Sequence, residues 1–229
     1  MDAIAENLKR VQERIASAAH RVGRAPEEIK LVGVTKTVEP QRINAAIKAG
    51  LTAIGENRIQ EAREKYPQVL PVEWHMVGHL QTNKVKYAVK MFDMIQSVDS
   101  VHLAEEINNR CEGLNKPMPV LIEVNTSGEE SKYGCKPSET IELVSKIKDL
   151  PFLSIRGLMT IGLFSDDPGE VRPCFQKLRE LAEQIKALQM PEVRMDILSM
   201  GMSADFEWAI EEGSNMVRIG TAIFGERPN

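Results

Sequence analysis

The sequence predicts one α/β domain spanning residues 1–229, a (β/α)8 TIM barrel with an additional N-terminal helix. Short apolar runs, typical of strands buried on both faces, recur eight times, and nearly all are followed by helical apolar spacing. No linker rich in Pro, Gly or Ser divides the 229 residues, a length that such barrels reach as one unit. An open doubly wound sheet is the structural alternative, but its GxGxxG fingerprint after the first strand is absent.

The chain opens on a helical pattern that precedes the first strand and is therefore additional to the barrel repeats. Its apolar residues recur at intervals of three and four and form one stripe of a helix. The stripe consists of Ile4, Leu8, Val11, Ile15, Ala18 and Val22. Gly23 is expected to end this helix.

The eight strands and the helices between them are expected in strict alternation. The strand candidates cover residues 31–34, 53–54, 73–77, 94–96, 120–124, 154–158, 195–198 and 216–219. The helical patterns cover residues 40–50, 58–65, 83–90, 101–111, 137–148, 168–188 and 204–212. The helix at 168 has the strongest start signal, because Asp167 can cap it and Glu170 follows three residues later.

Composition excludes several classes of partner. The net charge is −4, and no block of Lys or Arg offers the clustered positive charge that nucleic acids require. No apolar run approaches the ~20 residues of a membrane span, and the N-terminus lacks the pattern of a signal peptide. The three cysteines, Cys111, Cys135 and Cys174, have neither disulfide-framework nor zinc-ligand spacing. We therefore expect a cytoplasmic protein that binds neither nucleic acid nor membranes. We also expect a monomer, an expectation that does not follow from composition.

Polar residues that follow the strands are the candidates for chemistry, because the active face of a barrel lies at the strands' C-terminal ends. Lys36 follows the first apolar run. Burial of its stem at the barrel mouth would lower the amine's pKa toward the nucleophilic range and allow a Schiff base with an aldehyde. The plainer alternative is a lysine that only reaches solvent.

A candidate anion site follows the last two strands. Ser203 stands in the serine- and glycine-containing segment 199–203 and is either a phosphate ligand, a helix cap, or both. Arg218 ends the last strand, before Gly220, whose missing side chain would let a ligand approach the backbone. The alternative for this arginine is a surface ion pair. Two such loops are neighbours in a closed barrel, where phosphate sites commonly form.

Three further polar residues have weaker signals. Asn57 follows the second strand and either donates a hydrogen bond at the mouth or caps the next helix. His75 and His79 are four residues apart but lie on a strand and its loop, so they lack the HExxH arrangement of a helical metal site. We therefore expect no metal, and the sequence contains no Ser/His/Asp signature or P-loop.

Several motifs in the same order resemble the pyridoxal phosphate homeostasis protein family, the YggS/PROSC-like proteins. The similarity runs nearly end to end. The motifs are LVGVTK at 31–36, GEN at 55–57, WHMVGHLQTNK at 74–84, RGLMT at 156–160, SMGMSAD at 199–205 and VRIGTAIFG at 217–225. The resemblance implies a barrel similar to the N-terminal domain of alanine racemase, with pyridoxal 5'-phosphate (PLP) at its mouth.

The resemblance also implies a role for individual residues. It makes Lys36 the Schiff-base lysine and places Arg218 near the pyridine nitrogen. The other cofactor-binding positions that it implies are Ser203, Gly220 and Thr221 at the phosphate, Asn57 beside the cofactor and Met200 close to the ring.

The implied function is PLP binding without turnover, in homeostasis or delivery of PLP (vitamin B6) and amino-acid balance, with apo PLP-dependent enzymes as partners. A guanidinium beside the pyridine nitrogen disfavours protonation of that nitrogen and weakens the ring as an electron sink. The chain also ends at Asn229, with no room after Gly220 for the second domain of a racemase. Two alternatives remain open: a PLP-dependent amino-acid racemase, for which Tyr133 is the tyrosine to test, and a Schiff-base class I aldolase using Lys36.

Overall fold

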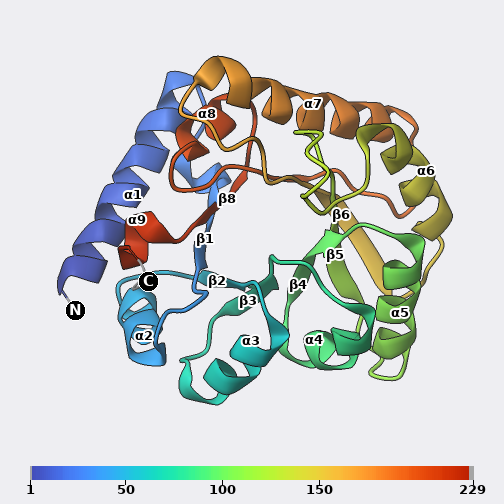
Figure 1. Cartoon of the computed structure of the whole chain (residues 1–229), viewed down its shortest axis with the longest axis horizontal. Helices are drawn as coiled ribbons and strands as arrows, with labels where there is room; N and C mark the ends of the chain where they lie inside the picture. The colour runs from blue at the N-terminus through green and yellow to red at the C-terminus, as the bar shows by residue number, and fades with distance from the viewer. Residues whose placement is uncertain (1, 227–229) are drawn as a thin grey trace.

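Eight parallel strands close into one barrel in chain order in the computed structural model, which describes residues 2–226 (Figure 1). The strands are β1 Lys30–Val34, β2 Ala53–Glu56, β3 Glu73–Met76, β4 Met94–Val98, β5 Met118–Glu123, β6 Leu153–Met159, β7 Ile197–Ser199 and β8 Met216–Ile219. β1 pairs with both β2 and β8, which closes the barrel. The predicted (β/α)8 barrel is therefore confirmed, and the open sheet is wrong.

Helices surround the barrel at every predicted place (Figure 1). They are α1 Asp2–Arg21, α2 Pro40–Lys48, α3 Ile59–Lys65, α4 Val85–Met91, α5 Val101–Glu112, α6 Pro137–Ile147, α7 Pro168–Ala187 and α8 Phe206–Glu211. A short helix after β8, α9 Thr221–Phe224, was not predicted, nor were the 3-10 turns Pro26–Glu28, Tyr66–Gln68 and Thr82–Lys84. One turn of helix is too short to show a hydrophobic period.

The additional N-terminal helix packs on the outside of the barrel. α1 lies against α8, α9 and α2 and crosses the side of the barrel where β1 and β8 meet (Figure 1). Five residues of its predicted stripe are buried: Ile4, Leu8, Val11, Ile15 and Ala18. The sixth, Val22, is 40% exposed because it lies beyond the last helical residue. At the end of the helix, Arg21 Nε donates a hydrogen bond to Glu211 Oε1 of α8 at 2.8 Å.

The start of α7 follows the prediction, and neither of the two residues for which capping was one alternative is a helix cap. Asp167 accepts a hydrogen bond from the N–H of Gly169 at 2.8 Å. α8 begins at Phe206 with Asp205 in the cap position, so Ser203 is not its cap. Asn57 is not a cap either, because Arg58 occupies that position before α3. The side chains of Ser203 and Asn57 are therefore available at the strand ends.

The core has two parts. A large cluster fills the layer between strands and helices, and a small cluster lies inside the barrel. The small cluster consists of Val32, Ala53, Met94, Leu121, Met159 and Met216. Buried polar side chains share the barrel interior, among them His75, Gln96, Ser199 and Arg218. The interior is thus partly a polar network that reaches the strand ends.

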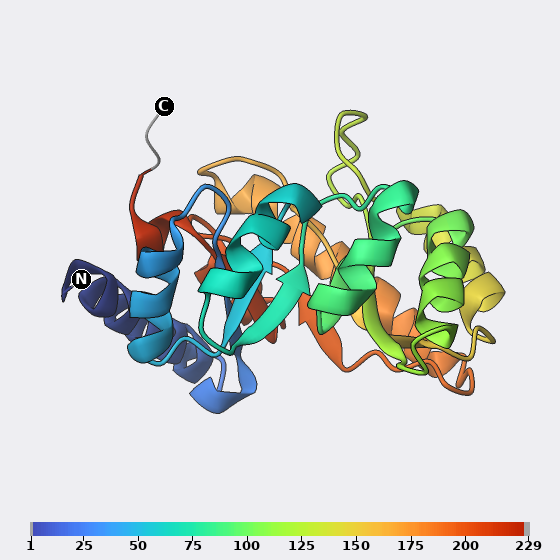
Figure 2. The same ribbon diagram turned by 90° about the horizontal axis from the view of Figure 1, so that it is seen from below.

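The C-terminal face of the barrel carries the longer loops. The segment between β5 and α6 projects above this face, where a single bridge between Val124 and Cys135 joins its two ends (Figure 2). Cys111, Cys135 and Cys174 are all buried and free. Among the helices of residues 2–226, none combines the length and the apolar character needed to cross a bilayer.

Candidate functional site

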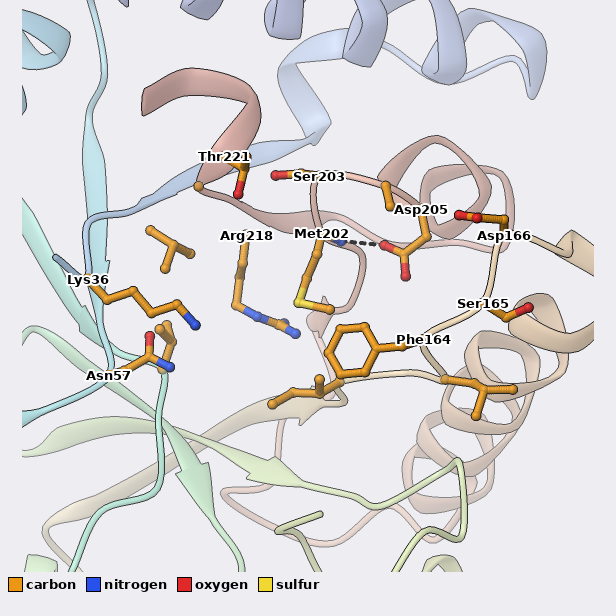
Figure 3. A pocket seen from close by; sticks show the side chains of 16 residues that line it. Lys36, Asn57, Phe164, Ser165, Asp166, Met202, Ser203, Asp205, Arg218 and Thr221 are labelled. Atoms are coloured by element: carbon orange, nitrogen blue, oxygen red, sulfur yellow. Dashed lines mark hydrogen bonds between the residues drawn. The ribbon is translucent and has the colours of Figure 1, made fainter. Parts of the chain in front are cut away.

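A cavity of about 550 Å³ opens at the C-terminal ends of the strands (Figure 3). The ends of β1, β2 and β3, the loops after β6 and β7, and the end of β8 supply its walls. Six of the seven residues predicted for a cofactor line it: Lys36, Asn57, Ser203, Arg218, Gly220 and Thr221. Residues distant in sequence are therefore assembled around one space, as the barrel prediction requires.

Met200 is the exception among the predicted residues. Its side chain is fully buried and belongs to the hydrophobic core, and it does not line the cavity. The chain turns at Gly201, which has a φ of +97°, and Met202 lines the cavity instead. The methionine side chain in the cavity wall is therefore that of Met202, after the turn, and that of Met200 lies in the core.

Lys36 and Asn57 approach one another across one end of the cavity (Figure 3). Each directly follows a residue with a buried side chain, which is Thr35 just after β1 for Lys36 and Glu56 at the end of β2 for Asn57. Asn57 Oδ1 is buried and has no hydrogen-bond partner within the described chain. Because buried polar atoms in proteins are nearly always paired, this oxygen indicates a place for a ligand donor or a water molecule.

The loops after β7 and β8 meet at the opposite side of the cavity. Ser203 Oγ accepts a hydrogen bond from the N–H of Ala222 at 3.4 Å, which joins the two loops. Thr221, the first residue of α9, stands beside Ser203 in the cavity wall (Figure 3). Two hydroxyls and Gly220 thus line the same space and can receive an oxyanion.

Arg218 lies between these two groups and is held rigidly. Its guanidinium donates to Ser199 Oγ at 2.6 Å and to the carbonyl of Thr160 at 2.7 Å. Burial lowers its pKa to about 10, while the negative charges of Glu123 and Asp205 act in the opposite direction. The guanidinium therefore remains charged at neutral pH and presents only donors to the cavity.

The remaining wall was not predicted from the sequence. It consists of the loop after β6, with Ile161, Leu163, Phe164, Ser165 and Asp166, together with Met202, Ala204 and Asp205 and with Val34 and Val77 at the strand ends. Phe164 is 72% exposed and stands at the opening (Figure 3). Asp205 accepts the N–H of Met202 at 2.6 Å, and burial raises its pKa. The signal for residues 161–166 was their place after a barrel strand, since that stretch carries no recognisable motif, whereas Met202 and Asp205 lie in the motif at 199–205.

His75, His79 and Tyr133 lie outside the cavity wall. His75 is fully buried inside the barrel. The ring of His79 stacks on that of Tyr133 with centroids 3.9 Å apart, and its Nδ1 lies 3.8 Å from Asp99 Oδ2. Within residues 2–226, no three His, Cys, Asp or Glu side chains are grouped so that they could hold a metal ion.

Comparison with known proteins decides the family. The family model described as alanine racemase, N-terminal domain, matches residues 1–228. The pyridoxal phosphate homeostasis protein of Aquifex aeolicus is 47% identical, and the alignment covers 97% of each chain. This chain belongs to the family of pyridoxal phosphate homeostasis proteins.

Two solved structures connect the pyridoxal phosphate homeostasis family to its fold. PipY of Synechococcus elongatus, solved with PLP bound, is 34% identical and superposes with a TM-score of 0.82 over 94% of this chain and 100% of its own. An alanine racemase of Clostridium difficile, 18% identical, superposes with a TM-score of 0.81 over 100% of this chain and 58% of its own. The second similarity shows that the barrel is shared with a much longer protein.

Proposed function

We propose that this chain binds PLP and acts in PLP homeostasis or delivery and in amino-acid balance, without turnover of its own. In this proposal residues 1–229 act as a single PLP-binding domain. The observation that carries it is the convergence of an amine, a guanidinium and two hydroxyls, those of Lys36, Arg218, Ser203 and Thr221, on one cavity. The curated name of the Aquifex aeolicus relative and the PLP bound to PipY support the same reading.

The donor set fits PLP group by group. The Lys36 amine is the nucleophile for the aldehyde, and the Arg218 guanidinium faces the pyridine nitrogen. Ser203, Gly220 and Thr221 receive the phosphate through hydroxyls and backbone, and the unpartnered Oδ1 of Asn57 accepts a donor beside the ring. Met200 has no place in this assignment because its side chain lies in the core.

The residues of this chain favour binding of the cofactor without catalysis. PLP supplies an aldehyde that condenses with a lysine amine and releases water. Arg218 cannot accept a proton, so it keeps the pyridine nitrogen unprotonated and limits carbanion chemistry on the ring. Tyr133, the tyrosine considered for a racemase, is 58% exposed and does not line the cavity, so the structure offers that alternative no specific support.

Apo PLP-dependent enzymes are the partners proposed for delivery. The exposed opening of the cavity, bordered by Phe164, gives a bound cofactor a route out of the barrel. We further propose that the protein is monomeric and that it is located in the cytoplasm. In that reducing compartment, free thiols such as those of its three buried cysteines persist.

Absorbance spectroscopy tests the proposed function. Purified protein incubated with PLP is expected to show an imine band, and borohydride is expected to fix the cofactor on the peptide that contains Lys36. The variant Lys36→Ala should lose the band, whereas Lys48→Ala, at the exposed end of α2, should retain it. A band that survives in Lys36→Ala would show that another lysine holds the cofactor. Transfer to an apo PLP-dependent enzyme in a second step tests delivery.

A further inference from the structure

A buried lysine that the proposed function does not use lies directly behind the cavity. Lys65, at the end of α3, is 7% exposed, and its ammonium makes three short contacts. Nζ donates to the carbonyl of Thr35 at 2.6 Å, to Glu56 Oε1 at 2.8 Å and to Glu61 Oε1 at 2.6 Å. An ammonium has three donors and no acceptor, so this set satisfies it completely.

Two of the three partners of Lys65, Thr35 and Glu61, lie at the peptide bonds on either side of Lys36. Thr35 precedes Lys36, and besides the carbonyl that Lys65 holds, its hydroxyl donates to Glu56 Oε1 at 2.6 Å. On the other side of Lys36, the N–H of Thr37 donates to Glu61 Oε1. The peptide is therefore fixed immediately before and immediately after Lys36, and one ammonium joins the two anchors.

Local backbone conformation shows why such anchors are needed. Thr37 has a φ of +61°, in the left-handed region that β-branched residues rarely adopt. Its hydrogen bond to Glu61 offsets the strain of this turn, which directs the chain away from β1 just after Lys36. Without that anchor the turn is expected to relax and to move Lys36.

The same cluster also holds the second polar residue at this end of the cavity. Glu56, the residue before Asn57, has a fully buried side chain, and its carbonyl accepts the N–H of Val77 at 3.0 Å. Burial raises the pKa of Glu56, and the hydrogen bonds from Lys65 and Thr35 oppose that rise. The charge of Lys65 therefore compensates a carboxylate that would otherwise be buried alone.

We propose that Lys65, together with Glu56 and Glu61, is a positioning residue for the cofactor lysine. It fixes the peptide on both sides of Lys36 and so sets the direction in which the Lys36 amine enters the cavity. The inference rests on the proposed function of Lys36 as the PLP-binding lysine. Displacement of a reacting group by ~1 Å costs about 100-fold in rate, so loss of this anchoring should affect Lys36 strongly.

The main test follows the chemistry of Lys36 in three variants. Lys65→Met removes all three contacts, Glu61→Gln weakens the anchor of Thr37, and Glu56→Gln combined with Lys65→Met removes the carboxylate that the single variant leaves buried. Thermal unfolding reports folding, and borohydride trapping followed by peptide mass analysis reports the rate of PLP attachment at Lys36. We expect attachment to slow roughly 10- to 100-fold in Lys65→Met and severalfold in Glu61→Gln.

The double variant separates positioning from folding. It is expected to recover thermal stability while attachment at Lys36 stays slow. Glu64→Gln, an exposed carboxylate on the same helix, is the matched control and should behave as the wild type. Attachment at the wild-type rate in a folded Lys65→Met or double variant would overturn the proposal. If neither folds, a wild-type rate in Glu61→Gln would overturn it.

A second measurement is independent of PLP. Competitive acetylation of the apo protein with acetic anhydride compares the labelling of Lys36 with that of exposed Lys48 in the same sample. We expect the ratio of the two rates to change at least severalfold in Lys65→Met and not in Glu64→Gln; an unchanged ratio would count against the proposal. If the wild-type protein attaches PLP elsewhere, the proposed function fails, but this ratio still tests the role of Lys65.

Discussion

The guanidinium of Arg218 donates to the hydroxyl of Ser199 at 2.6 Å, and this contact begins a hydrogen-bonded chain through the barrel interior. Ser199 donates to Gln96 Oε1 at 2.6 Å, and Gln96 Nε2 contacts His75 Nδ1 at 2.7 Å. His75 Nε2 then lies 2.7 Å from Glu73 Oε1. The chain therefore connects a cation at the cavity with a carboxylate at the other end of the barrel.

The hydrogen bonds in this chain all run in one direction, which determines the donor and the acceptor in each contact. With Gln96 Nε2 donating to His75 Nδ1, the proton of the neutral imidazole is on Nε2 and points to Glu73. Every donor then points away from Arg218. The chain holds the guanidinium, which lines the cavity, in one orientation without placing a negative charge in contact with it.

Ser199→Ala is expected to destabilise the protein, because both Arg218 and Gln96 lose a partner in the barrel interior. An unsatisfied buried polar group costs about 1–3 kcal/mol, so the free energy of unfolding should fall by roughly that amount. Urea denaturation measures it. Ser138→Ala, an exposed serine of α6, is the control and should stay within about 0.5 kcal/mol of the wild type. Equal stabilities of the two variants would mean that the chain contributes nothing.

Glu123 gives stability a pH dependence of unusual sign. The side chain is 3% exposed, and burial, assisted by the charge of Asp99, raises its pKa from 4.5 to about 7. Between these two pH values the unfolded chain releases a proton that the folded protein retains. Rising pH therefore favours unfolding, by about 3 kcal/mol over the whole interval.

Glu123→Gln should remove this dependence. At pH 8 the variant is expected to be more stable than the wild type by about 2–3 kcal/mol, and at pH 4 the two should be equal. Denaturation curves at a series of pH values measure this difference. A parallel pH profile for wild type and Glu123→Gln would contradict the assignment.

Glu73 provides the opposite case. Hydrogen bonding to His75 lowers the pKa of Glu73 to about 2, so its carboxylate stabilises the folded protein above pH 4.5. The variant Glu73→Gln should therefore be less stable than the wild type above pH 4.5.

The sequence predicted the barrel and six of the residues that line the cavity, because both follow from local signals. Buried strands appear as short apolar runs, and the strand ends place Lys36, Asn57 and Arg218 at one face. The direction of a side chain beyond a strand is set by turns, and so the sequence did not reveal that Met202, and not Met200, lines the cavity.

Contacts between residues distant in the sequence could not be predicted either. Lys65 ends an amphipathic helix, where a lysine normally reaches solvent, and only the packing of α3 behind β1 and β2 buries it. Phe164 likewise belongs to a loop without a motif, whose place over the cavity depends on the closed barrel. Such positions are properties of the tertiary structure.

Gly201 shapes the turn that presents Met202 and Ser203 to the cavity. Its φ is +97°, and a Cβ there would lie 2.6 Å from Ala209 Cβ and 2.9 Å from Phe206 Cα. Gly201→Ala should therefore cost about 1–3 kcal/mol of stability and weaken PLP binding by displacing Ser203. Unfolding and PLP titration measure both effects.

Gly113 is the matched control for this substitution. It has a helical φ of −62°, and a Cβ would meet nothing closer than 3.8 Å. Gly113→Ala should stabilise the protein by about 0.4–1 kcal/mol and leave PLP binding unchanged. If Gly201→Ala bound PLP as well as Gly113→Ala did, the turn would not position the site.

Ser203 distinguishes PLP from its unphosphorylated form in the proposed site. Ser203→Ala removes one hydroxyl donor from the phosphate, and hydrogen bonds to charged groups contribute about 1.5–3 kcal/mol, or about 10- to 100-fold in Kd. Pyridoxal has no phosphate, so its Kd should change little, and titration of both ligands into both proteins measures the difference. For each ligand, the Kd of the variant is compared with the Kd of the wild type, so that the unequal aldehyde content of the two ligands cancels. The control variant Ser138→Ala should change neither Kd. Equal weakening of both ligands by Ser203→Ala would place the phosphate elsewhere in the cavity.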